Sequence, residues 1–477
     1  MVLMKQRYVT LAPQYMLRGW QDHPDVLYDW SAAGGTGAKT LDLTPAQRFG
    51  IELAATPGVS IDAPLLLPSL KKAAQKMLDA GIFVECDKET GLKEYQKYRK
   101  FNTRMTHALL WSITGRCNLK CRHCYVSADE GVYGEFSFAQ CEEIVQQMLE
   151  AGIYSVAITG GEPLVHPDFW RILDLLVEKH IYVEEIFTNG MLVTDAFLDK
   201  LEQRNLNMNC FLLSFDGVGC HDWMRGVKGA EEKVIAAIRR LHERGYATIV
   251  STVVHEGNLS SLPATYELMK ELGVNVWKIA PVVNSGNWKK KENTTLASKA
   301  FTDACMSLLE LYVADGLPLG IKLGALFECR WSGGEMVYHI PSFCASETLH
   351  EQDTLCEAVR VTPLLLANGK LLTCLPMAGT ILEDMAPNIL TEEWNISRAL
   401  VESPVEAYTS ATYGELFKKN AQCGSCKHRL RCNHCPAEGL NVGNDIFAID
   451  GHNCLIADGG YEARVHALMQ GKCKKRD

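Results

Sequence analysis

The sequence lacks any run of about 18 consecutive apolar residues, the length that a helix needs to cross a bilayer. We therefore predict no membrane-spanning segment. The first residues also lack the pattern of positive charge followed by an apolar stretch that marks an export signal. Together these two absences favour a cytoplasmic protein.

An excess of positive charge is also missing. The 477 residues carry 48 Lys and Arg against 57 Asp and Glu, which gives a net charge of −9. This balance provides no non-specific attraction to nucleic acid or to an anionic membrane, so we expect neither as a partner. Apolar residues make up 47% of the chain, which is ample for packed cores. The length suits roughly three domains.

Cysteine, by contrast, is abundant, with 18 in the chain. Without an export signal, metal ligation explains so many thiols better than disulfides do. Three of them, Cys117, Cys121 and Cys124, follow one another at C-x3-C-x2-C spacing. They come directly after the apolar run 108–114, which is short and rich in β-formers and therefore predicts a buried strand. The three cysteines are thus expected on a loop at the carboxyl end of a strand.

Three thiolates so close in sequence can surround one metal centre. A structural zinc ion normally takes four ligands. A [4Fe–4S] cube held by three cysteines has one iron left for another ligand. A zinc site is therefore the alternative to a cube here.

The cysteine string resembles the signature of radical S-adenosylmethionine (SAM) enzymes, C-x3-C-x-Φ-C, with His123 at the usually aromatic position. The resemblance implies that the open iron binds the amino and carboxylate groups of SAM. It also implies that an electron from the cluster splits SAM to a 5′-deoxyadenosyl radical. His123 would then lie against the adenine, and Arg225 would meet the SAM carboxylate unless it is only a surface or ion-pair arginine.

Strand-like and helix-like stretches alternate over residues 107–325. Strands are expected at 109–114, 155–159, 183–188, 211–215, 248–254 and 274–280, with amphipathic helices at 168–180, 195–204, 230–244 and 261–272. Such alternation means parallel strands with helical crossovers. Six units are fewer than the eight of a closed barrel, so we predict an α/β fold with a partial (β/α)6 barrel of the TIM type. Its chemistry should gather at the carboxyl ends of the strands.

Short motifs follow the predicted strands at those ends. Gly160 and Gly161 let backbone approach a ligand without Cβ obstruction, and Glu162 after them offers an acceptor for an ammonium group. Ser214 and Asp216 point the same way from one strand and are placed to hydrogen-bond ribose hydroxyls. The family resemblance implies that the glycine–glutamate segment binds the amino group of SAM and that Ser214 lies near its ribose.

A second dense set of cysteines occupies residues 326–460. The spacing is Cys356-x12-Gly369-x4-Cys374, then Cys423-x2-Cys426-x5-Cys432-x2-Cys435, with Cys454 nineteen residues further on. A C-x2-C pair with two more cysteines nearby would by itself suggest a zinc ribbon. The whole arrangement resembles the SPASM extension of radical SAM enzymes, which holds two auxiliary [4Fe–4S] clusters. It departs from that pattern in having two residues, not three, between the last two cysteines of the run.

This second resemblance implies two ligand sets. The nearer auxiliary cluster would take Cys356, Cys374 and Cys435, with Cys344 expected as the fourth ligand and Cys329 in reserve. The distal cluster would take Cys423, Cys426, Cys432 and Cys454. Without a fourth ligand, the nearer cluster has an open iron that faces the substrate. One or two structural zinc ions are the alternative.

Residues 1–92 show a small winged-helix-like plan. Short strands are expected at 7–12 and 26–30, helices after Thr44-Pro45 and after Pro68, and a closing strand at 82–86. The plan resembles the recognition domain ahead of many peptide-modifying radical SAM enzymes, where a leader peptide adds a strand to a sheet edge. A packing appendage without a ligand is the alternative. Residues 93–106 are expected to be a linker, and 461–477 a C-terminal tail.

Together these resemblances imply a maturase of ribosomally made peptides. It would use three [4Fe–4S] clusters and SAM, act on a precursor peptide with a leader, and receive electrons from a donor such as flavodoxin or ferredoxin. We expect hydrogen abstraction followed by capture by a cysteine sulfur, which gives a thioether; carbon–carbon or carbon–oxygen crosslinking is the runner-up. Leu375 stands where sulfatase-activating enzymes have a basic aspartate, which argues against that activity. A zinc-stabilised binding module without catalysis is the alternative of another class.

Overall fold

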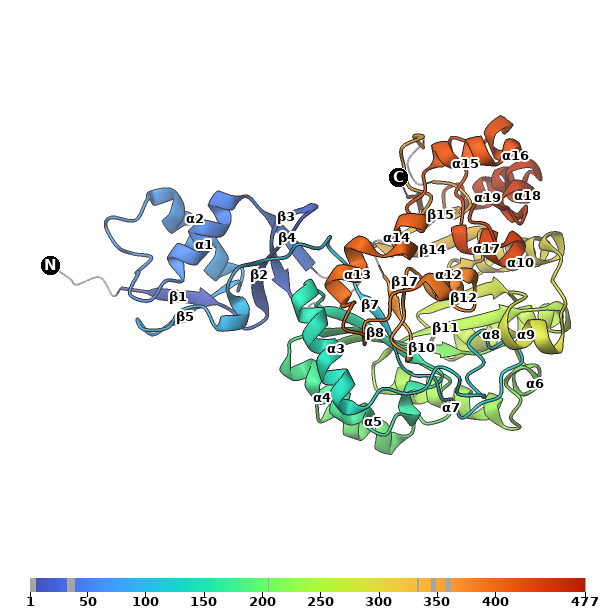
Figure 1. Ribbon diagram of the computed structural model, residues 1–477, viewed down its shortest axis with the longest axis horizontal. Helices are drawn as coiled ribbons and strands as arrows, with labels where there is room; N and C mark the ends of the chain where they lie inside the picture. Colours follow the sequence, from blue (N-terminus) through green and yellow to red (C-terminus); the bar gives the residue numbers. More distant parts are fainter. Residues whose placement is uncertain are drawn as a thin grey trace.

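The computed structural model describes residues 6–31, 39–204, 206–332, 334–344, 349–356 and 362–476. Figure 1 shows an N-terminal unit, a larger body in which helices cover one face of a sheet, and a C-terminal region of short helices. None of the helices in these ranges is both long enough and apolar enough to cross a membrane.

The main sheet is built around parallel strands. In spatial order they are β7 (Leu109–Thr114), β8 (Ser155–Gly160), β9 (Tyr182–Thr188), β10 (Met208–Ser214), β11 (Ala247–Val254), β12 (Val276–Pro281) and β13 (Gly320–Leu323). The predicted parallel α/β sheet is confirmed, and it is consistent with a partial barrel. It is larger than the six strands expected, because β13 pairs in parallel with β12 and so extends the barrel wall.

The sheet continues on both sides of these strands. β14 (Phe327–Ser332) and β15 (Glu335–His339) add antiparallel strands after β13, and β18 (Lys474–Lys475) pairs with β15. On the other side, β16 (Leu364–Leu365) pairs in parallel with β7, and β17 (Leu371–Leu372) pairs with β16. Segments from the end of the chain therefore complete the same sheet, so a boundary at residue 325 divides one continuous structure.

Helices cover the outer face of the sheet. They are α3 (Phe138–Ala151), α4 (Phe169–Glu178), α5 (Asp195–Glu202), α7 (Ala230–Glu243), α8 (Leu262–Glu271) and α10 (Ser298–Ala314). Alternate strand residues pack under them, among them the fully buried Trp111 and Trp277. Local signals set the helix ends: Ser137 and Gln140 form a capping box at the start of α3, and Gly152 ends it in the left-handed conformation.

The N-terminal unit combines two small sheets with two helices. It contains β1 (Tyr8–Leu11), β2 (Tyr15–Trp20), β3 (His23–Asp29), β4 (Lys39–Leu43), α1 (Pro45–Ala54), α2 (Pro68–Asp79) and β5 (Phe83–Cys86). β4, β3 and β2 form an antiparallel sheet, and β1 pairs with β5. Thr44 caps α1 together with Gln47, as predicted. β2 was not predicted from the sequence. Almost every one of its positions is buried, so the strand shows no polar–apolar alternation.

The predicted linker is packed between the N-terminal unit and the barrel. Within it, β6 (Arg99–Lys100) pairs with β2, and the buried Gln96 amide donates to three backbone carbonyls of the N-terminal unit at 3.1, 3.0 and 3.3 Å. Phe101 packs edge-on against Tyr154 of the barrel. Arg18 also donates to the Tyr154 hydroxyl, at 2.7 Å. These buried contacts fix the N-terminal unit to the barrel.

Short helices fill the C-terminal region. They are α12 (Ile381–Met385), α13 (Ile396–Glu402), α14 (Pro404–Thr409), α15 (Tyr413–Lys419), α16 (Ala421–Ser425), α17 (Pro436–Gly443), α18 (His452–Asp458) and α19 (Tyr461–Met469). Apolar side chains of α12, α14, α15 and α17 share a core with Leu110, Ala157 and Phe187 of the barrel strands, whereas those of α13, α18 and α19 belong to the main barrel core. The expected tail is built into the fold, since α19 packs on α10 and β18 joins the main sheet.

Candidate functional site

The loop after β7 brings Cys117, Cys121 and Cys124 to the carboxyl end of the parallel sheet. Each sulfur accepts a hydrogen bond from an N–H group. Backbone N–H groups reach Cys117 at 3.4 Å and Cys124 at 3.3 Å, and the Arg225 side chain reaches Cys121 at 3.6 Å. Burial raises the pKa of Cys117 to about 12, and the neighbouring Cys121 and Cys124 add to the rise. Three adjacent thiols with donors aimed at sulfur form a set suited to thiolates on one centre.

Two glycines bring the loop after β8 against the cysteine loop. A Cβ on Gly160 would lie 2.4 Å from the carbonyl oxygen of Thr114, and one on Gly161 would lie 2.3 Å from that of Arg116. Side chains do not fit at such distances, so both glycines are required for the close approach of two backbones.

Glu162 is fully buried and joins two loops at the strand ends. Its carboxylate accepts hydrogen bonds from the Thr188 hydroxyl at 2.9 Å and from the Asn189 backbone at 2.7 Å. Burial raises its pKa to about 7, while these donors oppose the rise. Asn189 in turn donates to Asn118 at 2.7 Å and to the Cys117 sulfur at 3.9 Å. Glu162 therefore positions a side chain that contacts the cysteine loop.

Arg225, at the end of α6 (His221–Arg225), forms a buried ion pair with Asp216. Its Nε lies 2.7 Å from Oδ2 of Asp216 and its Nη2 lies 3.1 Å from Oδ1. Burial alone would raise the pKa of Asp216, but the Arg225 charge holds it well below its usual range. Of the two roles left open for Arg225, the ion pair is present, and the same guanidinium reaches Cys121. Asp216 contacts Arg225 from the loop after β10, two residues beyond Ser214, the last residue of that strand.

His123 lies in the same buried cluster. Burial lowers its pKa to about 4, and the Arg225 charge contributes to the fall. The ring is therefore neutral at pH 7. Its Nδ1 is buried and has no hydrogen-bond partner among the described residues. A buried ring nitrogen without a partner, beside three cysteines, is suited to a polar atom of a ligand.

Asn287 was missed by sequence reasoning, although it makes direct contacts with the cysteine loop. It is fully buried in α9 (Gly286–Lys291). Its backbone N–H donates to the Cys124 carbonyl at 2.8 Å. Its side-chain amide donates to the Cys121 carbonyl at 3.2 Å and to Asp129 at 2.7 Å, and accepts from a loop hydroxyl at 2.9 Å. The only sequence signal was a Gly-Asn pair shortly after the last predicted strand.

Cys356, Cys374 and Cys435 lie together next to the first loop. Burial raises the pKa of Cys374 above its usual range, and the neighbouring Cys435 and Cys356 add to the rise. Tyr125 is close to both Cys124 and Cys374, since each of them contributes to its raised pKa after burial. The first two cysteine groups are therefore neighbours in the fold.

The two candidates for a fourth ligand of this group separate in space. Cys432, Cys344 and Cys356 all add to the raised pKa of Tyr413, which is mainly due to burial, so Cys344 lies near members of both cysteine groups. Cys329 instead lies on β14, fully buried and within hydrogen-bonding reach of Cys473. Cys329 is therefore a barrel residue that lies apart from the group, and Cys344 stays the predicted fourth ligand.

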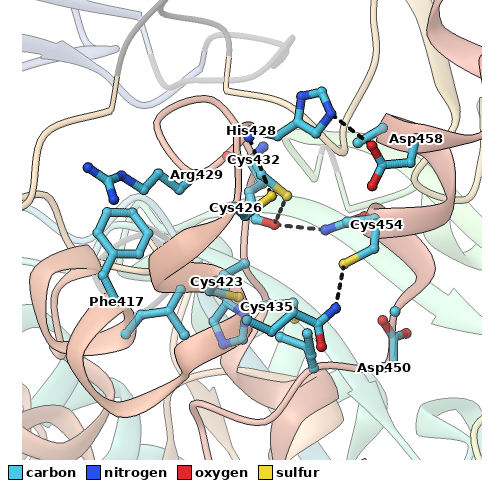
Figure 2. Close-up of a pocket in the computed structure, with 18 of the residues that line it drawn as sticks. Phe417, Cys423, Cys426, His428, Arg429, Cys432, Cys435, Asp450, Cys454 and Asp458 are labelled. Atoms are coloured by element: carbon cyan, nitrogen blue, oxygen red, sulfur yellow. Dashed lines mark hydrogen bonds and ion pairs between the residues drawn. The ribbon is translucent and has the colours of Figure 1, made fainter.

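Cys423, Cys426, Cys432 and Cys454 line a cavity of about 460 Å³ in the C-terminal region. Figure 2 shows these side chains around that cavity, with His428 pointing to Asp458 at its rim. Burial raises the pKa of Cys432 to about 12, and the other three thiols add to the rise. The four cysteines predicted as one set are thus brought together.

Comparison with known proteins places this geometry in a family. Residues 111–269 match the radical SAM superfamily. The chain is 32% identical over 361 residues to the pre-heme d1 synthase of Dinoroseobacter shibae, covering 72% of this chain and 84% of the relative. It is 30% identical over 367 residues to mycofactocin maturase MftC of Mycobacterium tuberculosis, covering 72% and 83%. SuiB of Streptococcus suis, solved with precursor peptide SuiA, has a TM-score of 0.58 at 15% identity, covering 86% of this chain and 97% of SuiB.

The fold and the cysteine loop define the class of protein, an iron–sulfur enzyme built on a partial barrel. The chain belongs to the radical SAM superfamily. Membership implies SAM and a [4Fe–4S] cluster, and the loop fits them through its three thiols, their N–H donors and the unpartnered His123 nitrogen. No three His, Cys, Asp or Glu side chains in the described ranges are placed to share a single metal ion. A cube does not need such a group, because each thiolate binds a different iron.

Proposed function

We propose that the protein is a maturase that abstracts hydrogen from a ribosomally made peptide and closes a thioether between a cysteine sulfur and a carbon. One relative is named a maturase, and SuiB was solved with a precursor peptide. The observation that carries the proposal is the N-terminal unit, which presents a sheet edge and is fixed to the barrel through Arg18 and Tyr154. A heme precursor, which the name of the D. shibae relative indicates for that protein, would not require this edge.

The winged-helix-like N-terminal unit supplies a site for the leader. β4 lies at the edge of its sheet, and Leu41 on it is 54% exposed. Beside it lies a cavity of about 450 Å³ whose lining includes Leu43, Ile51, Leu70 and Met77. An extended peptide can pair with such an edge through its main chain and place alternate apolar side chains in the groove. We assign the leader to β4 and this groove.

The cysteine groups are proposed as the ligands of three [4Fe–4S] clusters. Cys117, Cys121 and Cys124 bind the first; Cys344, Cys356, Cys374 and Cys435 the nearer auxiliary cluster; and Cys423, Cys426, Cys432 and Cys454 the distal one. SAM is assigned to His123, Gly160, Gly161, Glu162, Ser214 and Arg225, with Asp216 orienting Arg225. When bound, these cofactors supply a 5′-deoxyadenosyl radical and carry electrons from a donor of the flavodoxin or ferredoxin type. The protein positions the peptide and excludes water.

A thioether is preferred over other crosslinks because of the nearer auxiliary group. Cys356, Cys374 and Cys435 lie together. A substrate thiolate that replaces Cys344 at the fourth position of this centre would be deprotonated and held in place. Carbon–carbon or carbon–oxygen crosslinking by the same enzyme is the alternative.

The direct test is incubation of anaerobically purified protein with SAM, a reductant and the small peptide encoded beside its gene. We expect the peptide to lose the mass of two hydrogen atoms per ring, and to lose one alkylatable thiol per ring. The same mass loss with every thiol still alkylatable would select carbon–carbon or carbon–oxygen crosslinks. SAM cleavage without any change in the peptide would contradict a maturase.

The leader site has its own test. Leu41→Glu places a charge on the β4 edge and should weaken leader binding about tenfold, the cost of roughly 1.4 kcal/mol of lost apolar contact. Leu65→Glu is the matched control, because Leu65 is 98% exposed and does not line the groove. Equal affinities for the two variants, measured by calorimetry, would remove the leader from this groove.

A further inference from the structure

A cavity of about 720 Å³ lies on the inner face of the barrel sheet and has no role in the proposed function so far. Trp277 and Ile279 of β12 pack under the helices, while Lys278 between them lines the cavity from the opposite face. Ala157 also lines it, three residues before the end of β8 at Gly160. The lining also includes Phe187, one residue before the end of β9, and His107 and Pro318, which precede β7 and β13, so the cavity extends along the inner face to the amino ends of the strands. Its volume is within the range of about 300–1,000 Å³ typical of ligand pockets.

Two charged side chains line this cavity without a direct partner. Glu185 on β9 and Lys278 on β12 are half-buried, and neither makes a hydrogen bond or a close ion pair with any residue that the structure describes. They still influence each other: burial raises the pKa of Glu185, and the Lys278 charge opposes that rise. The other charged side chains in the lining are paired, namely Glu184 with Ser155, Glu328 with Lys322 and Arg330, and Lys270 with Glu267.

The lining mixes polar and apolar side chains. Leu110, Phe187 and Ile249 are apolar, whereas Asn209, Asn275 and Thr362 are polar and uncharged. A charge in such surroundings costs free energy unless a counter-charge or a hydrogen bond compensates it. Because Glu185 and Lys278 are not in contact, a ligand that reaches both of them would compensate both at once.

The chemistry of that ligand follows from the two signs. A cationic side chain would pair with Glu185 but face the like charge of Lys278, and an anionic side chain would do the reverse. An apolar side chain would leave both groups unpaired. A carboxamide is neutral and carries an N–H donor beside a C=O acceptor, so it can serve a carboxylate and an ammonium together.

We propose that this cavity binds a peptide residue with a carboxamide side chain, asparagine or glutamine, whose NH2 donates to Glu185 and whose oxygen accepts from Nζ of Lys278. The inference rests on the proposed function, because this residue would belong to the peptide substrate. Glu185 and Lys278 then select for this residue of the peptide.

The test uses four blocked amino acids of similar length, the N-acetyl methylamides of glutamine, glutamate, lysine and norleucine. Their affinities for the complete, cluster-loaded protein are measured by ligand-observed NMR titration. We expect the glutamine compound to bind about tenfold more tightly than each of the others, since each of them leaves at least one charged group unpaired. Glu185→Gln and Lys278→Met should each reduce this preference to about twofold or less. Glu271→Gln and Lys233→Met, on the exposed helix surfaces, are the matched controls and should preserve it.

A flat ranking, tighter binding of the norleucine compound, or no binding by any of the four would overturn the proposal. So would a glutamine preference that survives in both cavity variants. The ranking on the unaltered protein stands by itself if a variant does not fold. None of these measurements requires SAM cleavage or peptide modification. A flat ranking in a preparation that still crosslinks its peptide would therefore reject this inference alone, and a clear preference without crosslinking would reject only the maturase.

Discussion

Replacing Asn287 by alanine should free the cysteine loop without touching a cysteine. The substitution removes amide hydrogen bonds to the Cys121 carbonyl and to Asp129, and one from the Ser127 hydroxyl. A neutral hydrogen bond contributes about 1 kcal/mol and one to a carboxylate about 1.5–3 kcal/mol. The three together stabilise the closed loop by roughly 3–5 kcal/mol. Because 1.4 kcal/mol is a factor of ten, the open loop should become at least a hundredfold more populated.

Alkylation of the cluster-free protein under native conditions measures this opening directly. The reaction rates of Cys117, Cys121 and Cys124 are followed separately by peptide mass, and all three should rise roughly a hundredfold in Asn287→Ala. Lys289→Ala, an exposed position on the same helix, is the control and should leave the rates unchanged. Rates in Asn287→Ala within about threefold of the wild type would refute the reasoning, because local opening then does not depend on these bonds.

Three further changes test other contacts. Burial raises the pKa of Glu162 from 4.5 to about 7 in the folded state, so its carboxyl should destabilise the fold by about 3 kcal/mol as the pH rises from 4.5 to 7. Glu162→Gln has no ionisable carboxyl there and should not lose this stability. A difference in urea midpoint between wild type and variant that stays constant from pH 4.5 to 7 would argue against the raised pKa of Glu162. Asp216→Asn leaves Arg225 buried without its counter-charge and should lower the unfolding free energy by about 3–5 kcal/mol; a thermal midpoint equal to that of the wild type would contradict the buried pair. Tyr154→Phe removes the acceptor of Arg18 and should speed proteolytic release of the N-terminal unit about tenfold, whereas an unchanged rate would show that the contact does not hold this unit.

Short-range patterns in the sequence predicted much of the architecture. Six of the seven parallel barrel strands follow from apolar runs between amphipathic helices, and Thr44 caps α1 as its position before a proline suggested. The resemblance to the SPASM extension implied two sets of cysteines, and thiols of these sets lie near one another around Cys374 and around Cys432. Such features depend on neighbours along the chain, which a sequence displays directly.

Contacts between distant segments were the part that sequence could not predict. Asn287 meets Cys121 across 166 positions of the chain, and an isolated asparagine carries no periodic signal. The short strands β16 and β18 have two residues each, too few for an alternation pattern. The burial of Cys329 on β14, within reach of Cys473, was likewise not evident from the sequence, because the two cysteines are far apart along the chain.

We infer that the three-cysteine loop at the mouth of the barrel binds the cluster that acts on SAM. The most direct measurement compares release of 5′-deoxyadenosine by the anaerobically reconstituted wild type and by the triple variant Cys117→Ala, Cys121→Ala, Cys124→Ala. We predict that the variant releases none and that its iron content falls from about twelve to about eight per chain, the loss of one cube. Release of 5′-deoxyadenosine at the wild-type rate by the triple variant would contradict the account.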